Sequence, residues 1–204
     1  DMSNHFSSRG SKLVYQILNE PHKNDYTAMD AADLRYMTGL AYDKIRAREP
    51  NRLIAIGGNQ WFGVYEVGQV WTTLDDVGYG NDDYLMAACH NYNPWSFMGN
   101  GGGDLDEIYS DADTTACYDE LESWSNSVSG ANKVGLMVTE MGNGYASESG
   151  DGIFGALCNN LRLYYQKVHA NTEDGGAHFL WVDEGWFPGY NSYTDSWDNN
   201  HHTC

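Results

Sequence analysis

Basic residues are scarce in this chain of 204 residues, which has 11 Lys and Arg against 29 Asp and Glu and a formal charge of −18. A surface with such an excess of carboxylates repels the phosphate backbone of nucleic acids, so we do not expect DNA or RNA as a partner. The acidic excess favours solubility and is also found in salt-adapted proteins, and both interpretations stay open.

Long apolar runs are missing as well. No run of about eighteen apolar residues occurs, so no transmembrane helix is predicted. The first residues, 1–5, lack the basic and then apolar pattern of a signal peptide. We therefore expect a soluble chain, and its length predicts a single domain with one core over residues 1–204.

Two kinds of motif are also missing. The four cysteines, Cys89, Cys117, Cys158 and Cys204, have no CxxC spacing, which argues against a zinc knuckle or a thioredoxin-type site. Their even number allows zero, one or two disulfides, and apolar neighbours favour buried free thiols at Cys89 and Cys158. No predicted strand leads into GxGxxG or GxxxxGKS/T, so nucleotide binding has no support.

Two apolar segments of the chain each end in a glutamate. The segment 13–18 leads to Asn19 and Glu20 and is stopped by Pro21, which cannot extend a β-ladder. The segment 134–139 leads in the same way to Glu140. We interpret both segments as buried strands that place a carboxylate at the carboxyl end.

Strands and helices are predicted to alternate along the chain. Residues 1–12 are expected to be a frayed lead-in. Strands are expected to start near residues 13, 52, 84, 134 and 177, and helices to cover about 30–48, 62–74, 113–126 and 152–170. This βα repeat indicates an α/β fold with parallel strands, in which reactive groups lie at the carboxyl ends of the strands. The polar and aromatic residues at those ends are Asn19, Glu20, Asn59, His90, Tyr92, Glu140 and Trp181.

The residues at the strand ends suit the hydrolysis of a glycosidic bond. Such hydrolysis needs a proton donor and a second carboxylate about 5 Å away when the anomeric configuration is retained. Glu20 and Glu140 can supply this pair. The seven Trp and fifteen Tyr are too many to be hidden in one core of this size, and exposed rings of these types stack well on sugars.

The sequence resembles glycoside hydrolase family 5, the cellulase family, whose members are retaining enzymes built on (β/α)8 barrels. The matching segments are Ile17–His22, Ile45–Arg46, Pro50–Ile54, His90–Tyr92 with Pro94 and Phe97, Glu140–Gly142, and Trp181. The His, Tyr, Pro and Phe pattern resembles the endoglucanase branch. One departure stands out, because the family usually has a glycine before and a phenylalanine after the second glutamate, where this chain has Thr139 and Met141.

The resemblance implies a role for each candidate residue. Glu20 would be the general acid/base, Glu140 the nucleophile, and Asn19 a hydrogen-bond partner of the sugar 2-hydroxyl. His90 and Tyr92 would orient the substrate and the nucleophile. The remaining substrate-binding candidates are the tryptophans Trp61, Trp95 and Trp181, the last as the floor under the sugar beside the cleaved bond.

The resemblance also implies a partial barrel. The chain would supply about five parallel strands, strands 4 to 8 of the family fold, with the first three βα units missing. A second copy or a complementing fragment would then close the barrel, or the enzyme is shortened. The protein would be a secreted endo-β-1,4-glucanase acting on a β-glucan polysaccharide.

Three alternatives stay open at this point. The chain could be a β-mannanase or another β-glycanase of the same clan, or a half-barrel that binds glucan without turnover through Trp61, Trp95, Trp181 and Trp186. No metal or other cofactor is expected. Asp111 and Asp113 begin like a calcium loop but lack the glycine that such a loop needs, so a solvated acidic turn is predicted there.

Overall fold

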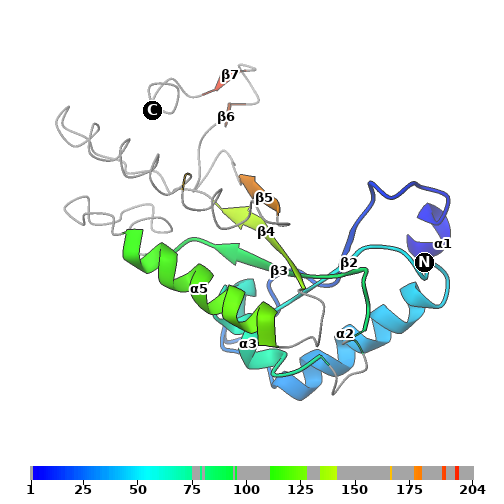
Figure 1. Ribbon diagram of the computed structural model, residues 1–204, viewed down its shortest axis with the longest axis horizontal. Helices are drawn as coiled ribbons and strands as arrows, with labels where there is room; N and C mark the ends of the chain where they lie inside the picture. Colours follow the sequence, from blue (N-terminus) through cyan, green and yellow to red (C-terminus); the bar gives the residue numbers. More distant parts are fainter. Residues whose placement is uncertain are drawn as a thin grey trace. The chain divides into compact units, whose positions relative to one another are not determined.

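The computed structural model in Figure 1 describes residues 2–74, 79, 81–93, 95, 111–127, 134–141, 166, 177–180, 190–191 and 196–197. The chain divides into two compact units, Asp1–His90 with Asp119–Met137, and Asn91–Tyr118 with Val138–Cys204. Within the described ranges, none of the helices combines the length and apolar character that crossing a membrane requires.

A five-stranded sheet carries the fold. Its strands are β1 (Tyr15–Gln16), β2 (Ile54–Gly57), β3 (Leu85–Asn91), β4 (Gly135–Met141) and β5 (Ala177–Leu180), in the order β1-β2-β3-β4-β5. β1 pairs with β2 and β2 with β3 in parallel, with Tyr15 opposite Ile54 and Ile54 opposite Leu85. The α/β fold with five strands is therefore confirmed, and the strands follow one another in chain order as crossover connections produce. A separate hairpin pairs β6 (Tyr190–Asn191) with β7 (Ser196–Trp197).

Strand β1 is shorter than the sequence predicts. The predicted strand covers residues 13–18 and leads to Asn19 and Glu20, but β1 covers only two residues. Leu18 and Glu20 have φ angles of 65° and 45°, in the left-handed region that breaks an extended backbone. The chain therefore leaves the sheet as a tight turn, and Glu20 is delivered by that turn.

Helix α2 (Ala31–Arg46) covers the first connection and is capped by Asp30, whose carboxylate accepts a hydrogen bond from the Ala32 amide at 2.8 Å. The buried side chains of α2 are Leu34, Thr38 and Tyr42. Met37 and Leu40 share the spacing of three and four residues that apolar side chains show along this helix, yet they are 43% and 49% exposed. The buried face is set by Tyr42, whose hydroxyl donates to Asp82 at 2.5 Å and whose ring packs on Tyr79.

Two short helices and one long helix complete the connections: η1 (Gln60–Phe62), α3 (Glu66–Val70) and α5 (Asp111–Ser127). Two tryptophans link them to the sheet. Trp71 is fully buried and its indole donates to the Gly57 carbonyl at 2.9 Å, while Trp124 of α5 donates to the Trp71 carbonyl at 2.6 Å. This chain of indole hydrogen bonds joins the end of β2 to the helical layer.

The helix at residues 2–6 and the start of α5 differ from the sequence prediction. Residues 2–6 form helix α1 (Met2–Phe6), so the frayed lead-in is wrong, and Ser3 is buried with its hydroxyl donating to Glu49 at 3.0 Å. Asp111 and Asp113 lie in the first turn of α5 rather than in an isolated acidic turn. Cys89 is buried as predicted, whereas Cys158 and the predicted helix 152–170, apart from Gln166, lie outside the described residues.

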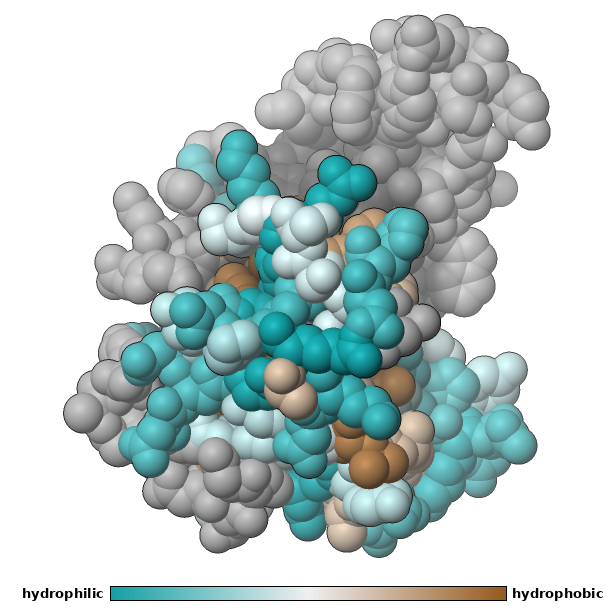
Figure 2. All heavy atoms as spheres, turned by 90° about the vertical axis from the view of Figure 1, so that its right-hand side faces the viewer, coloured by the Kyte–Doolittle hydropathy of each residue, from teal (hydrophilic) through white to brown (hydrophobic). Residues whose placement is uncertain are grey.

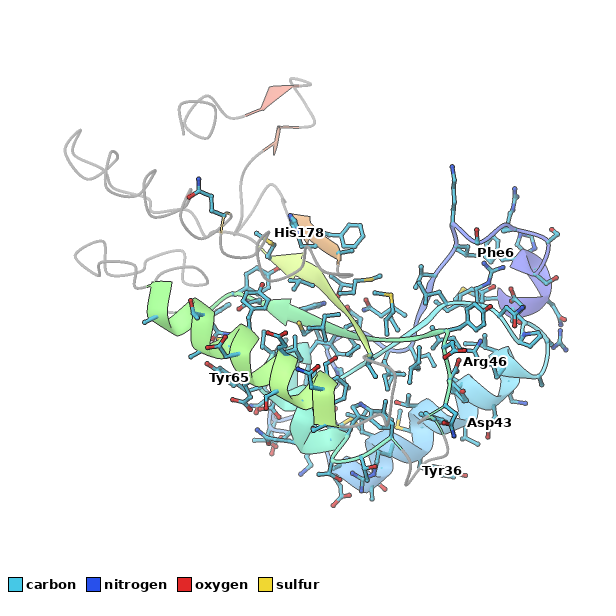
Figure 3. All side chains as sticks on the ribbon, viewed as in Figure 1. Phe6, Tyr36, Asp43, Arg46, Tyr65 and His178 are labelled. Atoms are coloured by element: carbon cyan, nitrogen blue, oxygen red, sulfur yellow. The ribbon has the colours of Figure 1, made fainter. Side chains whose placement is uncertain are left out.

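The surface matches the composition. Figure 2 shows a face on which most of the described residues are hydrophilic, as the charge of −18 leads one to expect. The larger exposed apolar side chains of α2 are Tyr36, Met37 and Leu40, and Figure 3 labels Tyr36 on this helix. Arg46, near the other end of α2, is held by an ion pair with Asp82 at 2.7 Å.

Candidate active site

Glu20 is positioned by a strained turn and by a histidine. The turn places Leu18 and Glu20 in the left-handed region, which costs non-glycine residues about 1–3 kcal/mol each and occurs often at functional sites. Asn19, between them, is exposed, and its side-chain oxygen accepts a hydrogen bond from Gln16 at 3.3 Å. Asn19 and Glu20 therefore both emerge at the carboxyl end of β1.

His90, near the end of β3, holds the Glu20 carboxyl. The His90 Nδ1 lies 2.8 Å from Glu20 Oε1, and the two side chains are 2% and 29% exposed. Phe62 packs on the imidazole with ring centroids 5.4 Å apart. A buried imidazole with one nitrogen on a carboxyl oxygen fixes that carboxyl in place while leaving its second oxygen for other chemistry.

The second unit contains a matching pair. The Tyr92 hydroxyl donates to Glu140 Oε2 at 3.0 Å, and both residues are half-buried. The Trp95 ring packs edge-on against Tyr92 at 6.2 Å between centroids and is 52% exposed. Glu140 thus has one carboxylate oxygen held by a phenol.

Each of the two orienting residues contacts one of the two glutamates. His90 contacts Glu20, the candidate acid/base. Tyr92 contacts Glu140, which is the contact that the resemblance implied. Trp181 and Trp186 lie outside the described residues. The roles of the individual site residues stay predictions.

Trp61 lies in an unusual turn after β2. Gln60, Trp61 and Phe62 have φ angles of 23°, 63° and 60°, so three successive non-glycine residues are left-handed. Phe62 is buried at 1% exposure, while Trp61 is 42% exposed. A Cβ on Gly57 would lie 1.8 Å from the Phe62 ring, so glycine is required at that position.

Asn59 is a structural residue of this turn. The sequence places it among the polar residues at the reactive ends of the strands, but it is 4% exposed. Its side-chain oxygen accepts from the Met29 and Gln60 amides, each at 2.9 Å, and its amide donates to the Met29 carbonyl at 2.7 Å. Its polar atoms are therefore used to join the turn to residue 29, and not to face a substrate.

Sequence reasoning missed two aromatic residues that belong to this region. His22 and Tyr26 pack on Trp61 with centroid distances of 4.4 and 5.8 Å. The short distance along the chain from Glu20 to His22 and Tyr26 could have indicated these rings. Their contact with Trp61 depends on the turn at residues 60–62, which hydrophobic periodicity does not predict.

A sheet with glutamates at the carboxyl ends of two strands, each hydrogen-bonded to a ring-bearing side chain, is the kind of arrangement that glycoside hydrolases use. The family follows from comparison. The model of the family Cellulase (glycosyl hydrolase family 5) matches residues 1–183, and the chain belongs to this family.

The chain matches known proteins over most of its own length but over only part of theirs. The chain is 24% identical over 211 residues to Endoglucanase H of Acetivibrio thermocellus, a match that covers 91% of this chain and 21% of that protein. Among solved structures, an endoglucanase has a TM-score of 0.75 at 16% identity and covers 99% of this chain, which spans 62% of that one. Thermotoga maritima Cel5A in complex with mannotriose has a TM-score of 0.72 at 17% identity, with 98% of this chain and 61% of that one covered.

These likenesses define the fold. The chain has the fold of part of a (β/α)8 barrel, and it spans about three fifths of the solved structures it matches. The prediction of a partial barrel from the cellulase family is confirmed.

Proposed function

We propose that this chain carries the catalytic residues of a retaining endo-β-1,4-glucanase. The observation that supports this most is that Glu20 and Glu140 lie at the carboxyl ends of strands in one sheet, each with an oriented carboxyl, in a chain of the cellulase family. Retention requires an acid/base and a nucleophile about 5–5.5 Å apart. Glu20 takes the first role and Glu140 the second.

The reaction has two steps. Glu20 protonates the glycosidic oxygen while a Glu140 oxygen attacks the anomeric carbon, so the glycosidic bond breaks and a covalent glycosyl ester forms. Glu20, now ionised, then takes a proton from water, which attacks the same carbon and releases Glu140. His90 and Tyr92 act as positioning residues through their hydrogen bonds to the two carboxyls.

Substrate binding is assigned to one polar and three aromatic side chains. Asn19 is exposed beside Glu20 and can bond the sugar 2-hydroxyl. Trp61 and Trp95 expose enough of their rings, 42% and 52%, to stack on sugar faces. Trp181 is proposed from the resemblance as the floor of the site. Because a polysaccharide substrate lies outside the cell, we also propose that the protein is secreted.

The direct test of the proposal is product analysis. The chain is expected to release reducing ends from soluble β-1,4-glucan faster than from β-mannan, and NMR is expected to show the β-anomer as the first product. A first product in the α-configuration would contradict the retaining mechanism. Faster release from mannan would replace the glucanase by a β-mannanase, which the mannotriose complex of a similar structure makes the second candidate. Binding to glucan without any release would leave the non-catalytic half-barrel.

The open side of the sheet supports a proposal about assembly. β1 comes first in the sheet order, and in the described part of the chain it pairs with β2 alone. Tyr36, Met37 and Leu40 expose an apolar face on the helix that follows β1. We propose that a further βα segment pairs with β1 and covers this face. When the chain is isolated, a second copy of the chain supplies that segment.

Light scattering tests the assembly. The isolated chain is expected to have a mass above 22.8 kDa that falls on dilution. Leu40→Glu should shift the mass toward the monomer, because it places a charge in the apolar contact, whereas Ser123→Glu, which adds the same charge at an exposed position of α5, should not. A monomeric mass for the unmodified chain at all concentrations would contradict the second copy.

A further inference from the structure

Gln16 is the one residue of the segment 13–18 whose side chain is neither aliphatic nor aromatic. Its neighbours Tyr15 and Ile17 are buried at 7% exposure, and side chains alternate along an extended segment, so Gln16 lies on the opposite face, where it is half-buried. A half-buried amide is stabilised by hydrogen bonds. The hydrogen bonds of the Gln16 side chain are made to the turn that delivers Glu20.

The Gln16 amide nitrogen makes two contacts in this turn. It lies 3.2 Å from the backbone carbonyl oxygen of Leu18 and 3.3 Å from the side-chain oxygen of Asn19. An amide nitrogen carries two hydrogens, so it can donate to both oxygens at once. The Leu18 contact also determines which way round the Gln16 amide lies, because a backbone carbonyl only accepts hydrogen bonds and must therefore face the nitrogen of Gln16 rather than its oxygen.

The orientation of the Asn19 amide follows from that of Gln16. A nitrogen that donates must face the oxygen of Asn19, so the nitrogen of Asn19 lies on the other branch of its planar amide, away from Gln16. Asn19 is exposed and directly precedes Glu20. The part of the Asn19 side chain that can meet a ligand beside Glu20 is therefore a hydrogen-bond donor.

We infer that Gln16 is a positioning residue of the reaction, which orients Asn19 so that its amide nitrogen donates to the 2-hydroxyl oxygen of the sugar beside the cleaved bond. The inference rests on the proposed function for the identity of the substrate. Hydrogen bonds to this hydroxyl strengthen in the transition state of glycoside hydrolysis. A donor that Gln16 holds in place before the substrate arrives therefore raises kcat more than it lowers KM.

Two substrates that differ in one hydroxyl test the role of Gln16. Gln16→Met keeps the length of the side chain but removes its donors. On an aryl β-cellobioside it is expected to lower kcat/KM about 2–10-fold, mostly through kcat, the effect of one misplaced neutral hydrogen bond. On the analogue that lacks the 2-hydroxyl next to the aryl group, Gln16→Met and the unmodified chain should have the same kcat/KM. Gln69→Met, at an exposed position of α3, is the matched control and should change neither value. An equal loss on both substrates, or no loss on either, would overturn the inference.

A double variant separates an action of Gln16 through Asn19 from an action through the Leu18 carbonyl. In a chain that already carries Asn19→Ala, Gln16→Met should cause no further loss of kcat/KM on the cellobioside, because both changes remove the same contact with the sugar. A second loss that adds to the first would mean that Gln16 acts by holding the turn that delivers Glu20, and it would contradict the inference.

NMR relaxation separates the outcome for Gln16 from that of the proposed function. The side-chain amide signals of Asn19 are identified by their absence in Asn19→Ala, and their order parameter is expected to fall in Gln16→Met. If the chain hydrolyses no glucan but this order parameter falls, the orientation of Asn19 by Gln16 stands and the hydrolase proposal fails. If the chain hydrolyses glucan and Gln16→Met changes neither the order parameter nor kcat/KM, the role of Gln16 fails and the hydrolase proposal stands.

Discussion

Glu20→Gln is expected to lower kcat on β-glucan about 10²–10⁴-fold, the range that loss of a positioned general acid produces. The amide of Gln keeps the size of the side chain and can still bond His90, but it has no proton to give the glycosidic oxygen. The release of reducing ends from soluble β-glucan measures the loss. Glu120→Gln, at an exposed position of α5, is the control and should retain full activity.

The leaving group of the substrate separates the two glutamates. An aryl glycoside with an acidic phenol needs little protonation, so Glu20→Gln should form the glycosyl ester at nearly the normal rate and then stall, giving a burst of phenol. Glu140→Gln lacks the attacking oxygen and should give no burst with any leaving group. A burst from Glu140→Gln, or full activity of either variant on glucan, would remove that residue from its assigned role.

The pairings of Glu20 and Glu140 with His90 and Tyr92 show which features of the site strand periodicity predicts and which it does not. Asn-Glu-Pro after an apolar run, and His-x-Tyr after another, are local patterns that place polar groups at strand ends. Parallel pairing then brings those ends to one edge of the sheet. Which ring meets which carboxyl depends on the left-handed turn at Leu18 and Glu20, and no residue of that turn is a glycine that would reveal it.

Asn59 shows that a polar residue at the end of a predicted strand can have a structural role instead of a reactive one. From the sequence, an Asn after a buried strand looks like His90 or Glu20. Its burial arises because Met29, thirty residues away, presents both backbone groups to one amide side chain, a match that depends on tertiary contacts. The buried face of α2 depends on tertiary contacts in a similar way. Thr38 and Tyr42 are buried while Met37 and Leu40 are exposed, because Asp82 and Tyr79 supply partners for Tyr42.

Arg52 accounts for the order of the N-terminal segment, which composition alone predicts to be frayed. Arg52 is 7% exposed, and its guanidinium donates to the carbonyls of Arg9, Gly10 and Leu13 at 2.7, 2.8 and 2.9 Å. It also forms an ion pair with Glu49 at 2.6 Å. Five donors in a fixed fork allow one side chain to bind all four partners, and a lysine could not replace it.

Arg52→Met is therefore expected to cost roughly 3–5 kcal/mol of unfolding free energy, because it leaves the Glu49 carboxylate buried without its counter-charge. Urea unfolding followed by circular dichroism measures this. Arg48→Met, at an exposed position nearby, should change the free energy by less than about 0.5 kcal/mol. The pair Arg52→Met with Glu49→Met should recover most of the loss, since replacing both charges removes the unpaired one.

The pH dependence tests whether the ion pair is the cause. Burial raises the pKa of Glu49, but hydrogen bonds from Arg52 and Ser3 and the nearby Tyr15 hydroxyl outweigh it, so the pKa of Glu49 lies below its ordinary value. Because the folded pKa of Glu49 is lowered, its stabilisation is present above about pH 4.3 and is lost as the pH falls through the folded value. In Arg52→Met, burial dominates and raises the pKa of Glu49, so that the folded state takes up its proton first and gains relative stability as the pH falls. The difference between the two proteins should therefore be largest near pH 7, begin to shrink as the pH falls through the raised pKa of Glu49 in Arg52→Met, and shrink further below about pH 4.3. A difference that stays constant from neutral to acidic pH would assign the loss to the three backbone carbonyls instead.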